Sequence, residues 1–267
     1  MKILAIALNT FGSFLRNKLM ILFLILCVCV VLLMMTPLLA YKAMTTAANA
    51  AQMKSMVMTL VGGIMFFVSG FGSLLAAWSA ADAVASERKS GTILAVLARP
   101  VHRWEFLVGK YLGVQMLMVV YVMMMFILSY LLAWMGGERI QSTPWVLIAY
   151  PLVRYAVYSG LAMFLVTVFH QIVTFGITMI IAVLALILQP STGTEHKLPE
   201  WLRATFYSVF PSTHLLSEDR FFTITQASLK QIGWVGHLTT LAYGLDYALV
   251  CLLLAIWSFH YRTLTRD

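Results

Sequence analysis

Long, uninterrupted runs of apolar residues dominate the pattern along this chain, with little alternation between apolar and polar positions. A helix needs about 20 apolar residues to cross the hydrocarbon core of a bilayer. Continuous runs of this kind predict membrane-spanning helices, whereas the strands of a membrane barrel alternate. The six predicted spans are 19–40, 56–81, 111–134, 145–169, the short 172–188, and 241–261.

A shorter amphipathic segment precedes the first span. Between residues 2 and 15, apolar side chains fall largely on one face of a helix. They are Ile3, Leu4, Ala7, Leu8, Phe11 and Leu15. We predict that residues 1–18 form a helix that lies in the inner membrane interface. The alternative is that this segment simply extends the first span.

The composition excludes several classes of protein. Hydrophobic residues make up 61% of the chain and charged residues only 10%, and the mean hydropathy is +0.90. Soluble domains are about a quarter charged, so this chain has too few charges to cover a soluble surface. An ordinary cytosolic enzyme, a disordered segment and a nucleic-acid-binding domain are excluded. The sequence predicts one all-α integral membrane domain over residues 1–267.

The net charge of +8 is concentrated on one side of the predicted membrane. With six spans, the N-terminal segment, the loop after the second span and the C-terminal tail share a side. Together they hold ten Lys or Arg residues and three acids, against seven and five on the other side. Positive charge marks the cytoplasmic side, so both termini are predicted to be cytoplasmic. The excess also suits an anionic inner leaflet.

The cytoplasmic loop between the second and third spans, residues 87–105, has the most informative pattern. Gly91 permits a tight break after a charged helix end, and Thr92 is a suitable cap for a new helix. The helix must end before Pro100. Its apolar residues are Ile93, Leu94, Val96 and Leu97. A two-turn helix is unstable alone, so it needs a groove in the membrane interface or on a cytoplasmic partner.

This loop resembles the first cytoplasmic loop of the permease subunits of ABC exporters of the second type, which have the type V fold. The matching residues are Glu87, Gly91, Thr92, Leu97, Arg99, Pro100, Arg103, Phe106, Gly109 and Lys110. The rest of the chain agrees in pattern, with an interfacial N-terminal helix, six spans and a long outer loop between spans five and six.

The resemblance implies that residues 92–99 form a coupling helix, which docks into a cleft on a separate ATPase subunit. Gly91 and Thr92 would begin it. The expected contacts with the ATPase are Glu87, Leu94, Leu97, Arg99, Pro100 and Arg103. The resemblance further implies two ATPase subunits and a dimer of this chain with itself or with a similar permease, in a prokaryotic cytoplasmic membrane. The alternative is a simple interfacial loop whose charges only orient the chain.

No motif for ATP binding accompanies the loop. The phosphate-binding pattern GxxxxGK[ST] is absent from the sequence. We therefore expect no cofactor in this chain and no ATPase activity of its own, with ATP and Mg²⁺ bound by the partner subunit. No residues with the spacing of a metal site or a catalytic pair stand out either, since Asp82 and Asp246 belong to opposite faces of the membrane.

The predicted outer loop, residues 191–240, is too long for a featureless connection. Pro199, Pro211 and Gly233 divide it into pieces that carry aromatic residues, which favour the membrane interface. The resemblance implies short outer helices that partly re-enter the membrane. The alternative is a loop resting on the surface.

Arg154 lies about nine residues into the fourth predicted span, and Asp246 lies near the outer start of the sixth. A charge within a span is costly and is a candidate for function. Arg154 is expected to face a water-filled cavity, pair with Asp246, or bind an anionic lipid or substrate group. The alternative is that the span begins near Tyr150 and that Arg154 reaches outward to the interface.

Two other functions are compatible with a chain of this kind. A stand-alone channel or secondary transporter would show internal repeats around a midplane site, and no convincing repeat relates residues 1–135 to 136–267. A membrane anchor subunit without transport is the second. Few polar residues lie in the spans, which fits a lipid or amphipathic cargo better than an ion. We expect membrane lipid to be a partner of the chain and nucleic acid not to be one.

Overall fold

The computed structural model describes residues 2–44, 50–90, 102–135, 144–187, 201, 210–216 and 234–261. Within these ranges the regular structure is helical, as the sequence predicts. The helices are α1 (Lys2–Arg16), α2 (Lys18–Met44), α3 (Ala50–Ser90), α5 (Arg103–Met135), α6 (Pro144–Val168), α7 (Gln171–Ile187), the 3-10 helix η2 (Thr213–Leu216) and α11 (Trp234–Tyr261).

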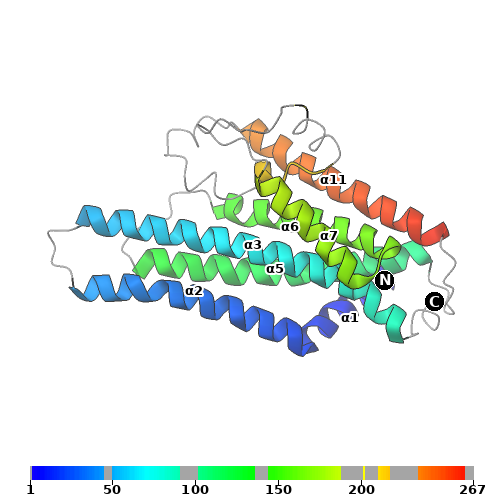
Figure 1. Cartoon of the computed structure of the whole chain (residues 1–267), viewed down its shortest axis with the longest axis horizontal. Helices are drawn as coiled ribbons and strands as arrows, with labels where there is room; N and C mark the ends of the chain where they lie inside the picture. Colours follow the sequence, from blue (N-terminus) through cyan, green and yellow to red (C-terminus); the bar gives the residue numbers. More distant parts are fainter. Residues whose placement is uncertain are drawn as a thin grey trace.

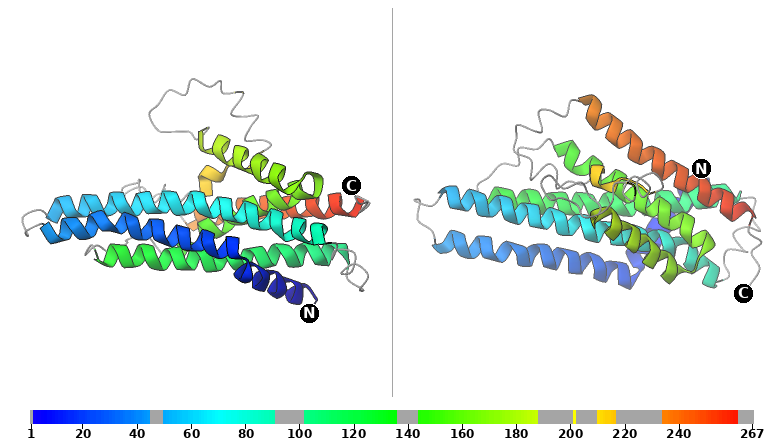
Figure 2. Two further views of the ribbon diagram at one scale, coloured as in Figure 1. Left: turned by 60° about the horizontal axis from the view of Figure 1, so that its bottom comes forward. Right: turned by 45° about the horizontal axis from the view of Figure 1, so that its top comes forward.

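The helices form an elongated bundle (Figures 1 and 2). α2, α3 and α5 run alongside one another, and α6, α7 and α11 lie on the other side of α3 and α5. The end of α3, the start of α5 and the ends of α6 and α11 gather where α1 packs (right in Figure 1). We call this the charged end of the bundle, because Arg16, Glu87, Arg88, Arg103, Glu105 and Lys110 lie in the helical turns there.

Four of the described helices contain segments that are long and apolar enough to cross a membrane. They are Phe67–Arg88, Arg103–Leu131, Ile148–Val168 and Trp234–Tyr261. A fifth is counted if α1 and the Met20–Leu33 part of α2 are taken as one bent span, and the apolar helix Gln171–Ala185 is shorter. The predicted count of six is therefore not confirmed.

Several helices are longer than the spans predicted for them. α3 has 41 residues, which corresponds to about 60 Å and far exceeds a hydrocarbon core of about 30 Å. α3 ends at Ser90 and α5 begins at Arg103, so both edges of the predicted loop 87–105 are helical. α11 begins at Trp234, inside the predicted outer loop 191–240. Hydropathy marks only the apolar part of a helix, which explains these differences.

The predicted N-terminal helix is present, and it is a helix separate from α2. α1 meets the Met20–Leu33 segment of α2 at 64°, a sharp bend that favours the interfacial helix over an extension of the span. The face of α1 that packs against the bundle carries Ala7, Thr10 and Phe14, which are buried. Leu4 and Leu8 remain more than half exposed.

Two glycines of α5 determine which face of α1 turns inward. A Cβ atom at Gly109 would lie 2.8 Å from the Ile6 Cβ, and one at Gly113 would lie 2.7 Å from the Thr10 Cβ and 2.8 Å from the Ala7 carbonyl oxygen. Only a residue without a side chain permits this approach of the two helices. The four-residue spacing of Gly109 and Gly113 allows a helix to approach closely, and α1 is the helix that does so.

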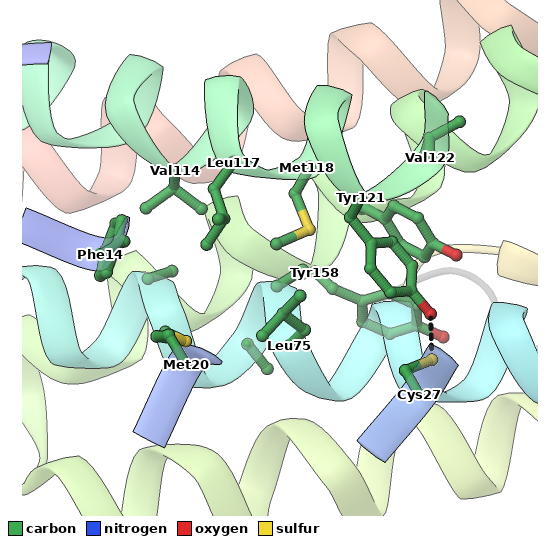
Figure 3. Close-up of a cluster of buried hydrophobic side chains, with 14 of the residues drawn as sticks. Phe14, Met20, Cys27, Leu75, Val114, Leu117, Met118, Tyr121, Val122 and Tyr158 are labelled. Atoms are coloured by element: carbon green, nitrogen blue, oxygen red, sulfur yellow. Dashed lines mark hydrogen bonds between the residues drawn. The ribbon is translucent and has the colours of Figure 1, made fainter. Parts of the chain in front are cut away.

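The largest apolar core fills the space between α2, α3, α5 and α6 (Figure 3). Figure 3 shows Met20 and Cys27 of α2 facing Leu75 of α3 and Tyr121 of α5. The Tyr121 hydroxyl donates to the Val68 carbonyl oxygen at 2.8 Å and lies 3.4 Å from the Cys27 sulfur. A buried tyrosine hydroxyl needs such a partner, so these contacts fix the relative position of the three helices.

Candidate functional site

The predicted coupling residues divide into two groups in the structure. Glu87 lies in the last turn of α3, and Arg103 is the first residue of α5. The predicted coupling helix falls outside the described residues, and so do six of the predicted site residues. These are Gly91, Thr92, Leu94, Leu97, Arg99 and Pro100. The site is therefore built from the two helices that flank this segment.

An ion pair joins those two helices. The Lys110 ammonium group of α5 donates to the Glu87 carboxylate of α3, and the two side chains are only 8% and 20% exposed. The Lys110 nitrogen also lies 5.5 Å from the centre of the buried Phe106 ring, within the range of a cation–π contact. Two charges removed from water in this way stabilise each other only as a pair. The pair therefore joins α3 to α5, with Glu87 at the start of the predicted loop and Lys110 shortly after its end.

Arg88, also in the last turn of α3, holds the end of a third helix. Its Nη2 donates to the Val166 carbonyl oxygen at 3.2 Å, two residues before α6 ends. The last four carbonyl groups of a helix have no partner within it. A cation at this position both satisfies such a group and opposes the negative end of the helix dipole.

Arg103 does the same for α11. Its Nη1 donates to the carbonyl oxygens of Phe259 at 3.4 Å and His260 at 3.1 Å, in the last turn of that helix. At the start of α5 itself, the backbone N–H of His102 donates to the Glu105 carboxylate at 2.9 Å. The Glu105 carboxylate thereby satisfies an N–H at the N-terminus of α5, the arrangement of a capping box.

The charged end therefore contains a connected set of contacts, which we call the tether network: Glu87–Lys110, Arg88 to α6 and Arg103 to α11. The sequence predicts Glu87 and Arg103 as contacts with a partner, and in the structure Glu87 pairs with Lys110 and Arg103 binds the end of α11. Lys110 and Arg88 were missed as site residues. The available signal was a cation within one turn of a predicted helix end, a position that favours contacts with helix carbonyls.

The two predicted charges within the spans lie apart from this end. Arg154 of α6 is partly buried, and its Nη2 donates to the Ser73 hydroxyl of α3 at 3.3 Å. Asp246 is exposed on α11. In the described part of the chain, Arg154 and Asp246 form no ion pair with each other, so the contact of Arg154 with α3 is the one that the geometry supports.

Other polar contacts between helices stabilise the bundle and place α6 centrally. The Gln115 amide donates to the Ser159 hydroxyl at 2.7 Å, and the Tyr111 hydroxyl donates to the Ala156 carbonyl oxygen at 3.0 Å. Nearer the opposite end, the hydroxyl of Tyr150 lies 2.8 Å from His237 Nδ1. α6 thereby contacts both α5 and α11. Among the described residues, no group of three or more His, Cys, Asp or Glu side chains could hold a metal ion.

Comparison with known proteins agrees with the apolar helices. The family model of the ABC-2 family transporter proteins matches residues 4–264, nearly the whole chain. No curated protein matches the sequence significantly. The match covers the tether network, the helices on both sides of it and all four candidate spans. The chain is therefore a membrane protein that belongs to the ABC-2 family of transporter proteins.

Proposed function

We propose that this chain is the transmembrane subunit of an ATP-driven ABC exporter. Family membership implies a partner ABC ATPase subunit. In the proposal, two copies of the chain, or this chain and a similar permease, assemble with two ATPase subunits that bind ATP and Mg²⁺. Each chain has six spans, with α1 in the inner interface and both termini in the cytoplasm.

The tether network is the observation that supports this proposal most directly. The predicted coupling helix, residues 92–99, lies between Ser90 at the end of α3 and Arg103 at the start of α5. Glu87–Lys110 joins those two helices, Arg88 holds α6, and Arg103 holds α11. A displacement of the coupling helix would therefore reach four helices through polar contacts that lie within a few residues of it.

This arrangement gives Glu87 and Arg103 a role different from contact with the ATPase. Glu87 and Arg103 each bind another helix of the chain, so we assign them a role in transmitting movement between helices. Docking itself is assigned to the apolar side chains Leu94 and Leu97, to Arg99 and to the turn at Pro100. ATP binding would push residues 92–99 and tilt α3 and α5 together, since their ion pair would be costly to break.

The cargo pathway is proposed to pass beside Arg154. A partly buried cation within a span is costly unless it serves function, and its contact with Ser73 bridges α6 to α3, one of the helices that would tilt. A lipid or amphipathic molecule with an anionic group is the cargo class that fits a charge-poor bundle with a partly buried cation at Arg154.

Replacement of Leu97 tests the docking step. The chain and its partner ATPase are co-purified with Leu97→Asp, which places a charge in the apolar contact, and with Leu97→Met as the matched control. We expect Leu97→Asp to lose most of the bound ATPase and Leu97→Met to retain it. Equal recovery of the ATPase with both variants would overturn the proposed coupling helix.

A further inference from the structure

A groove at the charged end shares Arg103 with the tether network. It has a volume of about 610 Å³ and runs between the start of α5 and the last turns of α11. Its lining includes His102, Arg103 and Trp104 from α5 and its N-terminal flank, and Leu253, Trp257 and His260 from α11. This is large enough for a lipid headgroup with the first part of its acyl chains.

The lining changes from apolar to cationic along the helix axis. Leu253 is 55% exposed and lies seven residues, or about 10 Å, before His260 on α11. Trp257 lies between them and is 63% exposed, and Trp104 on the facing wall is 47% exposed. On a membrane protein such exposed apolar side chains face lipid, and tryptophan favours the level of the headgroups.

The polar end of the groove has the chemistry of a phosphate site. The imidazoles of His102 and His260 are exposed, on either side of Arg103. The Arg103 guanidinium carries five N–H donors, and within the described residues its hydrogen bonds use only Nη1. The nearby Glu105 carboxylate is engaged by the backbone N–H of His102. An anion at this place would meet the remaining donors of Arg103 and the N–H groups of the two imidazoles.

We propose that this groove binds one anionic phospholipid, with its phosphate at His102, Arg103 and His260 and its acyl chains along Leu253 and Trp257. The cationic end of the groove coincides with the charged end of the bundle, where the headgroups of a bilayer lie if α5 and α11 span it. A zwitterionic lipid would fill the same apolar wall but gain less from the Arg103 cation, since each Lys or Arg near an anionic surface contributes about 1 kcal/mol. The site depends on membrane placement, and it does not depend on the proposed coupling helix.

The test compares lipid retention by the full-length chain in detergent, measured by native mass spectrometry during titration with phosphatidylglycerol or phosphatidylcholine. The test variant is His102→Glu with His260→Glu, two exposed positions whose replacement places carboxylates against the phosphate. The matched control is His170→Glu, an exposed histidine just before α7 at the same end of the bundle but outside the groove. Thermal unfolding of each variant is measured in parallel.

We expect the unaltered chain and His170→Glu to bind phosphatidylglycerol about tenfold more tightly than phosphatidylcholine. The double variant should lose that preference and unfold at the same temperature as the control. Equal affinity of the unaltered chain for the two lipids would overturn the proposal, as would an equal loss in His170→Glu. Competition by glycerol 3-phosphate as strong as that by the lipid would also overturn it, because the site would then be an anion site. Loss of a dimer in the double variant would show that a second copy covers the groove.

Discussion

Lys110 of α5 is paired with Glu87 of α3, 23 residues earlier in the chain, and both side chains are largely buried. Between them lies the segment with the coupling-helix pattern. The pair thus joins α3 to α5 close to the loop for which an ATPase contact is proposed. α3 and α5 are expected to move as a unit because separating them would leave two buried charges without their partners.

Breaking this pair should destabilise the chain strongly. We expect Glu87→Gln or Lys110→Met alone to cost about 3 kcal/mol, because each leaves the opposite charge buried. The double variant should be more stable than either single variant, which would measure the coupling between the two residues. Unfolding in detergent, followed by temperature or denaturant, provides the comparison. Single variants as stable as the unaltered chain would show that the charges are not energetically coupled.

The contact between α1 and α5 should tolerate no added methyl group at Gly113. A Cβ there would lie 2.7 Å from the Thr10 Cβ, so Gly113→Ala should cost about 1–3 kcal/mol through overpacking. Gly176→Ala in α7 is the control, since nothing lies within 4 Å of its added Cβ. That change should be neutral or stabilise by up to about 1 kcal/mol through helix propensity. Faster hydrogen exchange in α1 for Gly113→Ala alone would identify undocking as the cause.

The Tyr121 hydroxyl should contribute measurably to the packing of the core. Tyr121→Phe removes a 2.8 Å hydrogen bond to the Val68 carbonyl oxygen in a fully buried place, and we expect a loss of about 1 kcal/mol. Tyr130→Phe, at a residue that is 56% exposed on the same helix, should have no effect on the free energy of unfolding. Equal effects of the two changes would contradict the role given to the buried hydroxyl.

Arg154 should matter for transport more than for assembly. In the assembled transporter, Arg154→Gln removes the charge within the span while keeping a donor for the Ser73 hydroxyl. We expect ATP-dependent export to fall by about tenfold or more, since charges within spans are retained for function, with recovery of the ATPase unchanged. Export at the normal rate would remove Arg154 from the proposed pathway. Loss of the ATPase would show a structural role instead.

The sequence predicts most of the secondary structure because apolar runs and caps are local signals. The N-terminal helix and the all-helical architecture follow from residues near one another in the chain. The ends of the helices were less well predicted, as for α3, where polar residues up to Ser90 continue a helix past its apolar part. Hydropathy contains no information about such extensions.

Contacts between distant residues were the part that the sequence could not provide. Glu87 and Arg103 stood out in the loop motif, but their partners, Lys110 and the end of α11, depend on how the helices pack. The same holds for Arg154, for which a pair with Asp246 was one expectation and Ser73 of α3 is the contact found. For α1, the sequence assigned the apolar face to the membrane interface, whereas the packing of Ile6, Ala7 and Thr10 against Gly109 and Gly113 depends on a helix far along the chain.

The packing of α1 against α5 couples any movement of α5 to the membrane surface. α1 rests on α5 through Gly109 and Gly113 and turns sharply away from α2, with Leu4 and Leu8 exposed on its outer side. If those leucines lie among the lipid headgroups, any tilt of α5 would move the amphipathic helix α1 through the membrane surface. The bilayer would then act as a load on the transport cycle, and its stiffness and lateral pressure would set part of the rate.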